Sequence, residues 1–184
     1  MRTEDLQTTD KARRSAAVVS GVLCLAGIAV ASYLTYAHYT TAKVLACSDK
    51  GLINCAKVTT SSYSRIFGVP VADTGLGYFL VMTALCTPSA WRSTNQILRG
   101  LRVLAALSGV GMILWLVYVE LYRLDSICLY CTAVHAITVL LFVTVALGTA
   151  ATAVALDDET DDRRPNRAGE VVPGATGWGD PPLV

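Results

Sequence analysis

Two pairs of cysteines carry the most evident chemistry in this sequence. Cys128 and Cys131 form a C-x-x-C motif, and Cys47 and Cys55 are separated by seven residues of a polar segment. The first pair opens a run without charged residues, 126–156, which places it at or just inside a membrane surface. Paired thiols of this kind exchange electrons through thiolates and disulfides. The sequence therefore favours redox chemistry at a lipid boundary.

The C-x-x-C pair is expected at the N-terminal end of a helix. Residues three apart share a helix face, and a helix N-terminus stabilises a thiolate. With Asp125 or Ser126 as the predicted N-cap, Cys128 would be the more exposed thiol. Cys131 would lie one turn deeper, where a lipid-soluble acceptor can reach it. A structural disulfide or two packing thiols are the alternative, but a bridge across so short a loop stabilises little.

The loop pair has two open interpretations. Taken alone, Cys47 and Cys55 are more often a structural staple than a redox pair, because a flexible loop readily closes such a disulfide. A second pair on the same side of the membrane reverses that preference. The four cysteines together could instead bind zinc, but these spacings at a lipid boundary would make an unusual site, so no metal is expected. Cys24 and Cys86 are predicted to be small buried hydrophobic residues, and Cys86 is expected to lie away from the chemistry.

Four apolar stretches predict four membrane-spanning helices. The chain is 53% hydrophobic and 16% charged, and stretches of about 20 residues cross a bilayer as helices. The predicted spans are residues 15–36, 74–90, 103–119 and 127–156. The second is the weakest, because it is short and holds Gly75, Gly77 and Pro88. We therefore predict an all-α integral membrane protein, a four-transmembrane-helix bundle with an extracytoplasmic loop or half-helix between its first two helices.

The chain is expected to form one membrane domain flanked by two tails. Residues 1–14 would be a cytoplasmic tail and residues 15–156 the membrane domain, with the loop 40–73 outside the cytoplasm. Residues 157–184, acidic and then rich in Gly and Pro, are expected to be a disordered cytoplasmic tail. A cleavable signal peptide competes with the first span, since two arginines precede it and 29–31 resembles a cleavage site. Apolar character that continues to Tyr39 favours a retained helix.

The positive charges predict the orientation of the bundle. Ten of the Lys and Arg residues fall on one side of the predicted spans: Arg2, Lys11, Arg13, Arg14, Arg92, Arg99, Arg102, Arg163, Arg164 and Arg167. Five fall on the other: Lys43, Lys50, Lys57, Arg65 and Arg123. Both termini are therefore expected in the cytoplasm. Both cysteine pairs would face the periplasm or exterior, where disulfides persist.

Other function classes lack their motifs. No basic patch interleaved with aromatic residues indicates a nucleic-acid partner, and no G-x-G-x-x-G, P-loop or H-E-x-x-H motif is present. The main rival is a non-enzymatic tetraspan membrane protein whose structural outer-loop disulfide only holds the fold. It explains the loop pair and leaves the C-x-x-C pair without a role. A membrane metal carrier is a third class.

The order of these features resembles the vitamin K epoxide reductase family, in particular its bacterial branch. Four helices, a loop C-x7-C and a C-x-x-C that opens the last helix carry the resemblance, which covers roughly residues 15–150. It extends to the segments Cys55-Ala56-Lys57-Val58, Phe67-Gly68-Val69-Pro70 and Gly75-Leu76-Gly77-Tyr78. In this family a membrane quinone oxidises the C-x-x-C pair, and the loop pair oxidises a thioredoxin-like protein that introduces disulfides into exported proteins.

The resemblance implies a role for each cysteine in a quinone-linked thiol oxidase of a bacterial inner membrane. Cys47 would meet the thioredoxin-like partner, Cys55 would bridge transiently to Cys128, and Cys131 would face the quinone, either menaquinone or ubiquinone. Many bacterial members carry a fused thioredoxin-like domain. None is expected here, so the partner would be a separate periplasmic protein.

Candidate quinone-site residues follow from the same resemblance and from the spacing around the cysteines. Ser61 matches the family's Ser or Thr near the quinone. Asp73 stands where animal members have an Asn, and His135 stands where they have a Tyr. His135 shares a helix face with Cys131 and could transfer a proton to the quinone, or be a buried neutral imidazole bonded to another helix. Vitamin K epoxide itself is not expected as the substrate. Candidate apolar walls, with plain helix packing as the alternative, are Phe67, Leu76, Tyr78 and Val134.

Overall fold

The structure is a computed structural model that describes part of the chain. It covers residues 2–40, 47 and 52–162, and within these ranges the side chains of residue 7 and of residues 10–154. The remainder of the expected loop, 41–46 and 48–51, and of the expected tail, 163–184, lies outside the described residues.

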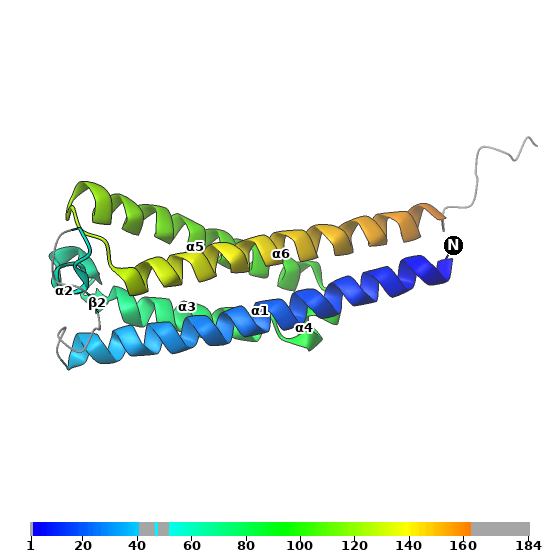
Figure 1. Cartoon of the computed structure of the whole chain (residues 1–184). Helices are drawn as coiled ribbons and strands as arrows, with labels where there is room; N and C mark the ends of the chain where they lie inside the picture. The colour runs from blue at the N-terminus through cyan, green and yellow to red at the C-terminus, as the bar shows by residue number, and fades with distance from the viewer. Residues whose placement is uncertain (1, 41–46, 48–51, 163–184) are drawn as a thin grey trace, which may run out of the picture.

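Four helices form an elongated bundle: α1 (Arg2–Tyr39), α3 (Val71–Leu85), α5 (Gln96–Tyr122) and α6 (Leu129–Asp162). α1 and α6 run antiparallel along the length of the bundle, α3 packs against α1, and α5 packs against α6 and α3 (Figure 1). The N-terminus and the end of α6 lie at one end, and the short elements that follow α1 lie at the other (Figure 1). The predicted all-α four-helix bundle is confirmed.

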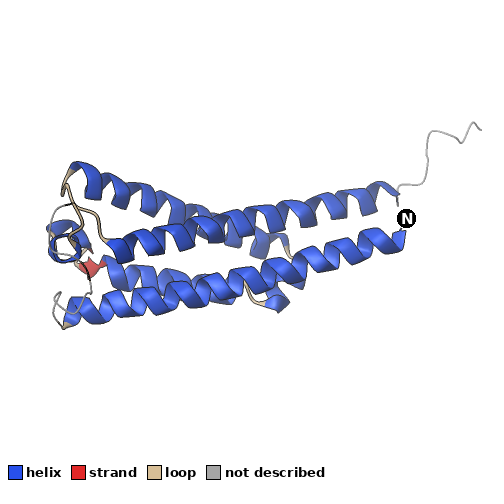
Figure 2. Ribbon diagram, in the orientation of Figure 1, coloured by secondary structure: helices blue, strands red, loops and turns tan. Residues whose placement is uncertain are grey.

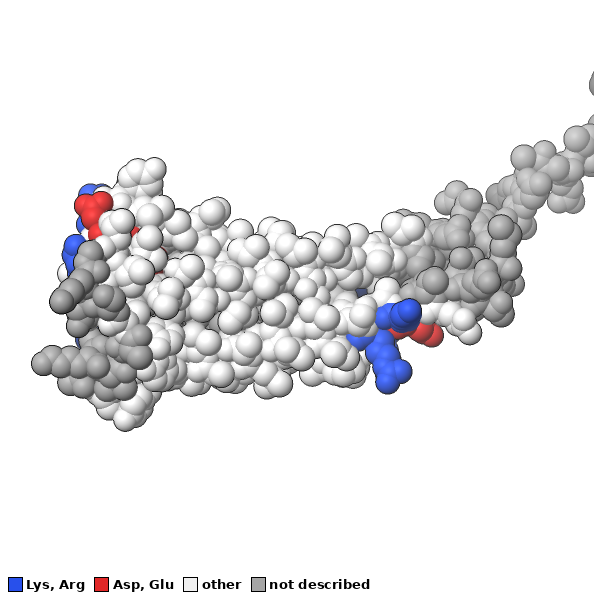
Figure 3. Space-filling view, in the orientation of Figure 1, with Lys and Arg blue, Asp and Glu red and all other residues white. Residues whose placement is uncertain are grey.

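Three helices are long and apolar enough to cross a membrane: Asp10–Tyr39, Gln96–Tyr122 and Leu129–Val154. On the face shown in Figure 3 the charged residues gather toward the two ends, and the stretch between them carries none. The first and last helices of the chain are longer than the predicted spans, since α1 already begins at Arg2 and α6 continues to Asp162.

The second span is shifted from its predicted bounds. α3 has 15 residues and is therefore about 22 Å long, shorter than the ~30 Å hydrocarbon core. The chain turns at Thr87, whose side chain accepts a hydrogen bond from Ala90 N (3.3 Å). Pro88 then begins a separate short helix, α4 (Pro88–Arg92). Proline is favoured at a helix start and disfavoured within one, which explains the break.

Three small elements connect α1 to α3, as the expected loop or half-helix requires. They are α2 (Cys55–Thr60), a single 3-10 turn, η2 (Ser62–Ser64), and a hairpin of β1 (Arg65–Ile66) and β2 (Val69–Pro70). Figure 2 shows the hairpin at the end of the bundle away from the N-terminus. Phe67 and Gly68 form its turn, both with positive φ (50° and 84°), the conformation that two-residue hairpin turns need.

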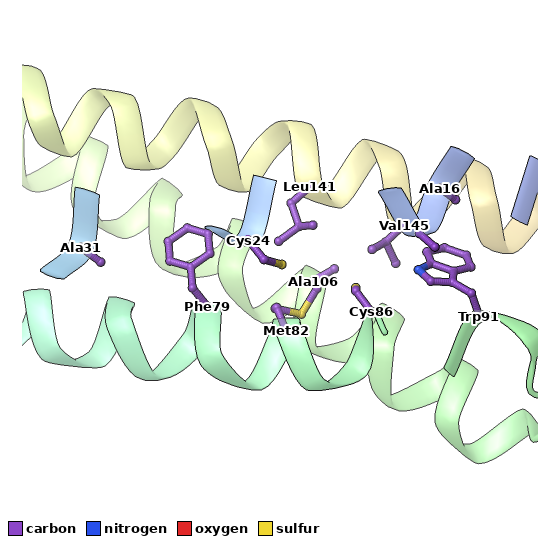
Figure 4. Packing of buried hydrophobic residues seen from close by; sticks show 11 residues of the cluster. Ala16, Cys24, Ala31, Phe79, Met82, Cys86, Trp91, Ala106, Leu141 and Val145 are labelled. Carbon is purple, nitrogen blue, oxygen red and sulfur yellow. The ribbon is translucent and has the colours of Figure 1, made fainter. Parts of the chain in front are cut away.

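The main core lies between α1, α3 and α6 (Figure 4). Phe79, Met82 and Leu141 are fully buried there, and Cys24 and Cys86 are buried beside them as the sequence predicts. α1 approaches α3 closely because Gly27 faces the Phe79 ring. A Cβ at Gly27 would lie 2.3 Å from the nearest ring atom.

This close approach yields a stability prediction. Replacing Gly27→Ala should destabilise the protein by about 1–3 kcal/mol, because the added Cβ would force the buried ring of Phe79 out of its packed position. The matched control is Gly21→Ala on the same helix, where an added Cβ meets nothing within 4 Å. That change should leave stability equal or slightly higher. Thermal unfolding in detergent measures both. Equal melting temperatures for the two variants would contradict the packing described here.

Candidate active site

A short backbone pairing brings the two cysteine motifs together. Ile53 and Ile127 form an isolated parallel bridge. Asn54 N donates to the Ile127 carbonyl (3.1 Å), and Ile127 N donates to the Leu52 carbonyl (2.7 Å). Cys55 begins α2 two residues after Ile53, and Cys128 directly follows Ile127. The bridge therefore sets these two cysteines side by side.

All four redox cysteines lie at one end of the bundle, called the cysteine end below. Cys55 and Cys128 are each fully buried in one small cluster, against which Cys47 and Cys131 pack. Cys47 and Cys55 form a disulfide with a Cα–Cα distance of 5.9 Å, within the usual range. Cys128 and Cys131 are free thiols. The structure thus holds an oxidised loop pair next to a reduced C-x-x-C pair.

Two side-chain contacts hold the start of α2 in this position. Asn54 caps the helix, since its Oδ1 accepts a hydrogen bond from Lys57 N (2.9 Å). Lys57 Nζ in turn donates to the Leu124 carbonyl (2.5 Å), in the turn that leads from α5 toward Cys128. The loop is therefore fastened to the same turn on both sides of Cys55.

The start of α6 differs from the sequence prediction in two ways. The helix begins at Leu129, so neither Asp125 nor Ser126 is its N-cap, and Asp125 instead adopts positive φ (42°) in the preceding turn. Cys128 takes the capping position, and its Sγ accepts a hydrogen bond from Cys131 N (3.4 Å). Cys128 is also the more buried thiol of the pair, not the more exposed one, because the loop around Cys55 covers it.

Hydrogen bonding tunes the Cys128 thiol. The Cys131 side chain, and then the Cys131 backbone N–H, lower the pKa of Cys128 by stabilising its thiolate, against the opposite effect of burial. A lowered pKa makes this thiol both a better leaving group and a more abundant nucleophile at neutral pH.

An apolar cavity lies directly below the cysteine cluster. Its volume is about 320 Å³, and it is enclosed by α1, α3, α5 and α6 with α2 and η2 over it. Cys131 contributes to its wall, whereas Cys128 does not. A largely apolar cavity of this size with a few polar groups is typical of small-molecule sites. It is the place where a membrane quinone could reach the C-x-x-C pair.

Four of the seven predicted quinone-site residues line this cavity: Ser61, Tyr78, Val134 and His135. The other three lie outside it. Phe67 is fully exposed at the hairpin turn, Asp73 accepts a hydrogen bond from the Tyr39 hydroxyl (2.7 Å), and Leu76 packs against the main core. The hairpin explains the position of Phe67, because its turn points the side chain away from the bundle.

The Tyr78 hydroxyl and the His135 imidazole both line the cavity without a hydrogen-bond partner among the described residues. The Tyr78 hydroxyl is buried without a hydrogen bond, beside Gly109. His135 is 8% exposed, and its imidazole makes no hydrogen bond to any residue that the structure describes. Buried polar groups normally have a partner. A ligand with oxygen atoms, such as a quinone, supplies acceptors for such donors.

Among the cavity residues that the sequence prediction missed is an acidic one, Glu120 near the end of α5. It is 6% exposed, lines the cavity with Cys131 and His135, and its carboxyl makes no hydrogen bond or ion pair with a described residue. Its backbone carbonyl accepts from Ser126 N (3.2 Å), which fixes it to the turn before the C-x-x-C motif. An acidic residue at the end of an apolar span is a sequence signal of function, and this signal could have identified Glu120.

A bound metal ion would require several ligating side chains gathered at one point. Across residues 2–40, 47 and 52–162, no group of three or more His, Cys, Asp or Glu side chains is arranged to hold a metal ion.

Comparison with known proteins agrees with this geometry. The family model described as "Vitamin K epoxide reductase family" matches residues 18–146, which include α3 and α5, parts of α1 and α6, and both cysteine pairs. A search of curated protein sequences gave no match. The chain therefore belongs to the vitamin K epoxide reductase family and is a multi-pass membrane oxidoreductase of the quinone-dependent, thiol-oxidising kind.

Proposed function

We propose that this protein oxidises a separate thioredoxin-fold protein outside the cytoplasm and passes the electrons through its two cysteine pairs to a membrane quinone. The observation that carries the proposal is the shared burial of Cys55 and Cys128 in one cluster, with Cys131 on the cavity wall. The first pair can exchange bonds with the second, and the second can reach a lipid-soluble oxidant. Such an activity would support disulfide formation in exported proteins.

The first half of the reaction is thiol–disulfide exchange at the loop pair. A thiolate of the partner attacks Cys47 and breaks the Cys47–Cys55 bond, releasing Cys55 as a thiolate. The partner's second thiolate then attacks its own sulfur in this mixed disulfide, which frees Cys47 and leaves the partner oxidised. Two electrons now reside on the loop pair as two reduced cysteines.

The second exchange moves the electrons inward. Cys55 attacks Cys128 in a Cys128–Cys131 disulfide and releases Cys131 as a thiolate. Cys47 then attacks Cys55, re-forms the loop disulfide and releases Cys128, whose lowered pKa makes it a good leaving group. The products are a closed loop disulfide and two reduced C-x-x-C thiols, the state that the structure holds.

The last step returns the C-x-x-C pair to its disulfide. Cys131, on the cavity wall, gives up electrons to the quinone substrate, and Cys128 closes the bond onto the Cys131 sulfur. Two electrons and two protons leave as quinol. Glu120 and His135 line the same cavity and can transfer protons, and the Tyr78 hydroxyl can donate a hydrogen bond to a quinone oxygen.

The membrane and its orientation are part of the proposal. The charge asymmetry of the sequence favours both termini in the cytoplasm and the cysteine end on the other side of the membrane. The resemblance to the bacterial branch of the family implies a bacterial inner membrane, so that this end would face the periplasm. Lys57 and Arg123 belong to the less positive side, and the arginines after α3 belong to the more positive one. An oxidising compartment at the cysteine end suits a disulfide-exchanging loop.

The relay predicts a specific cross-link. In a Cys47→Ser, Cys131→Ser variant, Cys55 and Cys128 should form a stable disulfide, because each has lost the cysteine that would resolve it. Cys24 and Cys86 are replaced by Ala throughout, which removes the remaining thiols. Peptide mapping by mass spectrometry after mild oxidation identifies the bond. Failure of Cys55 and Cys128 to pair, while either reacts freely with an added thiol reagent, would exclude the relay.

The unpartnered hydroxyl predicts a separation of stability from binding. Tyr78→Phe should leave the melting temperature of the ligand-free protein unchanged or raised, because the buried hydroxyl has no partner to lose. The same change should raise the KM for quinone about fivefold, since a hydrogen bond contributes about 1 kcal/mol. Tyr63→Phe, at a half-exposed tyrosine of the same cavity, is the control and should change neither. A wild-type KM in Tyr78→Phe would remove this residue from the site.

The buried carboxyl predicts a defect confined to the quinone step. Glu120→Gln keeps the size of the side chain but cannot transfer a proton, so quinone reduction should slow about 100-fold. Exchange between Cys55 and Cys128 should proceed close to its normal rate, because attack of a thiolate on a disulfide needs no proton from Glu120. Stopped-flow absorbance of the quinone measures the rate of quinone reduction, and quenched alkylation measures the rate of exchange between the two cysteines. Wild-type quinone reduction in Glu120→Gln would show that this carboxyl has no part in proton transfer.

A further inference from the structure

A small polar cleft lies in the other half of the bundle, away from the cysteine end. Three arginines face it, Arg13 from α1 and Arg99 and Arg102 from α5. Hydroxyl groups and one indole complete its lining: Trp91, Ser93, Thr94 and Thr152. Among the side chains that the structure describes, no acidic residue is part of this lining.

Arg102 is the residue of the cleft whose side chain is held most firmly by its neighbours. It is 1% exposed, its Nε donates to the Leu85 carbonyl (2.9 Å), and its guanidinium carbon lies 4.0 Å from the centre of the Trp91 ring. The Trp91 ring is itself buried in the main core, where Figure 4 shows it. The guanidinium is therefore fixed in place. One of its nitrogens, Nη2, is buried without a hydrogen-bond partner.

A second unpartnered donor faces the same cleft. Arg13 Nε is also buried without a hydrogen-bond partner. None of the three arginines forms an ion pair with a carboxylate whose side chain the structure describes. Arg99 and Arg102 are also one helical turn apart, so their like charges repel. Several positive charges and two N–H groups without an acceptor are costly in a partly buried site, and a bound anion would compensate both.

The size of the cleft and its level in the bundle narrow the choice of anion. Its enclosed volume is about 10 Å³, which admits one oxygen atom and leaves the rest of the ligand outside. Arg13 lies near the beginning of the apolar stretch Asp10–Tyr39, and Thr152 lies near the end of Leu129–Val154. The cleft thus lies at the boundary between apolar and polar surface, the level of lipid phosphates. Arginine pairs with phosphate through several parallel hydrogen bonds.

We propose that this cleft binds the phosphate of an anionic lipid headgroup, with one phosphate oxygen between Arg13 and Arg102 and with Arg99 at the rim. The proposal is independent of the thiol relay, because it involves none of the cysteines or cavity residues. A lipid held there would link α1, α5 and α4 at the end of the bundle opposite the chemistry.

Native mass spectrometry of the whole protein with added lipid tests the proposal. Phosphatidylglycerol should be retained in preference to phosphatidylcholine. Its apparent affinity should fall about tenfold in Arg13→Gln and in Arg99→Gln, because each loses a charge-assisted hydrogen bond. Arg14→Gln and Arg92→Gln are the matched controls, since these exposed arginines lie outside the cleft, and they should bind like the wild type.

A second arm separates lipid from free phosphate and guards against misfolding. Melting temperatures without lipid show whether each variant folds, and only the lipid-induced increase is compared. Equal retention of both lipids, or equal affinities in all four variants, would overturn the proposal. So would the same stabilisation by inorganic phosphate alone. A melting temperature that responds to none of the three additives would overturn the proposal as well.

Discussion

The pairing of two short backbone segments, one around Ile53 and one around Ile127, is the constraint on which the rest of the site depends. Two hydrogen bonds join a loop after α1 to the residues that begin α6, and cysteines follow on both sides. The pairing buries Cys128 under the loop, where its side chain is 0% exposed. Besides Cys131 of its own motif, the cysteine buried in the same cluster is Cys55 on that loop. The pairing therefore places the proposed exchange partners next to each other.

The two cysteines of the C-x-x-C motif face different surroundings because they occupy different positions at the helix start. Cys128 caps α6 and faces the loop, whereas Cys131 lies one turn on and faces the cavity. A disulfide between them connects a thiol-exchange compartment with an apolar one. The short α3 and the elements before it leave room for that apolar compartment at the cysteine end. A tetraspan protein with a purely structural loop disulfide would need neither arrangement, and membership of a family of thiol oxidoreductases favours an enzyme over it.

Features with a strong local signal were predictable from the sequence. The apolar stretches, the proximity of the two cysteine pairs and the spacing of His135 from Cys131 all follow from periodicity and charge. The break after α3 was predicted only to within a few residues. The predicted span held Pro88 as a weak point and continued to residue 90, whereas α3 ends at Leu85 and Pro88 begins α4. The prediction that Val134 and His135 lie near the C-x-x-C pair agrees with the cavity lining, because both follow Cys131 at a fixed spacing on α6.

Features that depend on docking between distant segments were not predictable. The exposure of Cys128 was predicted wrongly, because the loop that covers it is about 70 residues away in sequence and its docking leaves no local pattern. Phe67 lies away from the cavity because a hairpin turn, which the sequence reading did not assign, orients it. Glu120 was overlooked because it closes a span instead of interrupting one. The cleft that contains Arg13, Arg99 and Arg102 collects residues from four helices, α1, α4, α5 and α6, and no spacing along the chain could assemble it.

The central claim is that electrons pass between the loop pair and the C-x-x-C pair through a bond between Cys55 and Cys128. The most direct measurement is a single turnover of the wild-type protein, started fully reduced, mixed with quinone and quenched by acid at successive times for disulfide mapping. The account predicts that Cys128–Cys131 forms first, that Cys55–Cys128 rises and decays, and that Cys47–Cys55 accumulates last. Formation of Cys47–Cys55 before or without the other two bonds would contradict it.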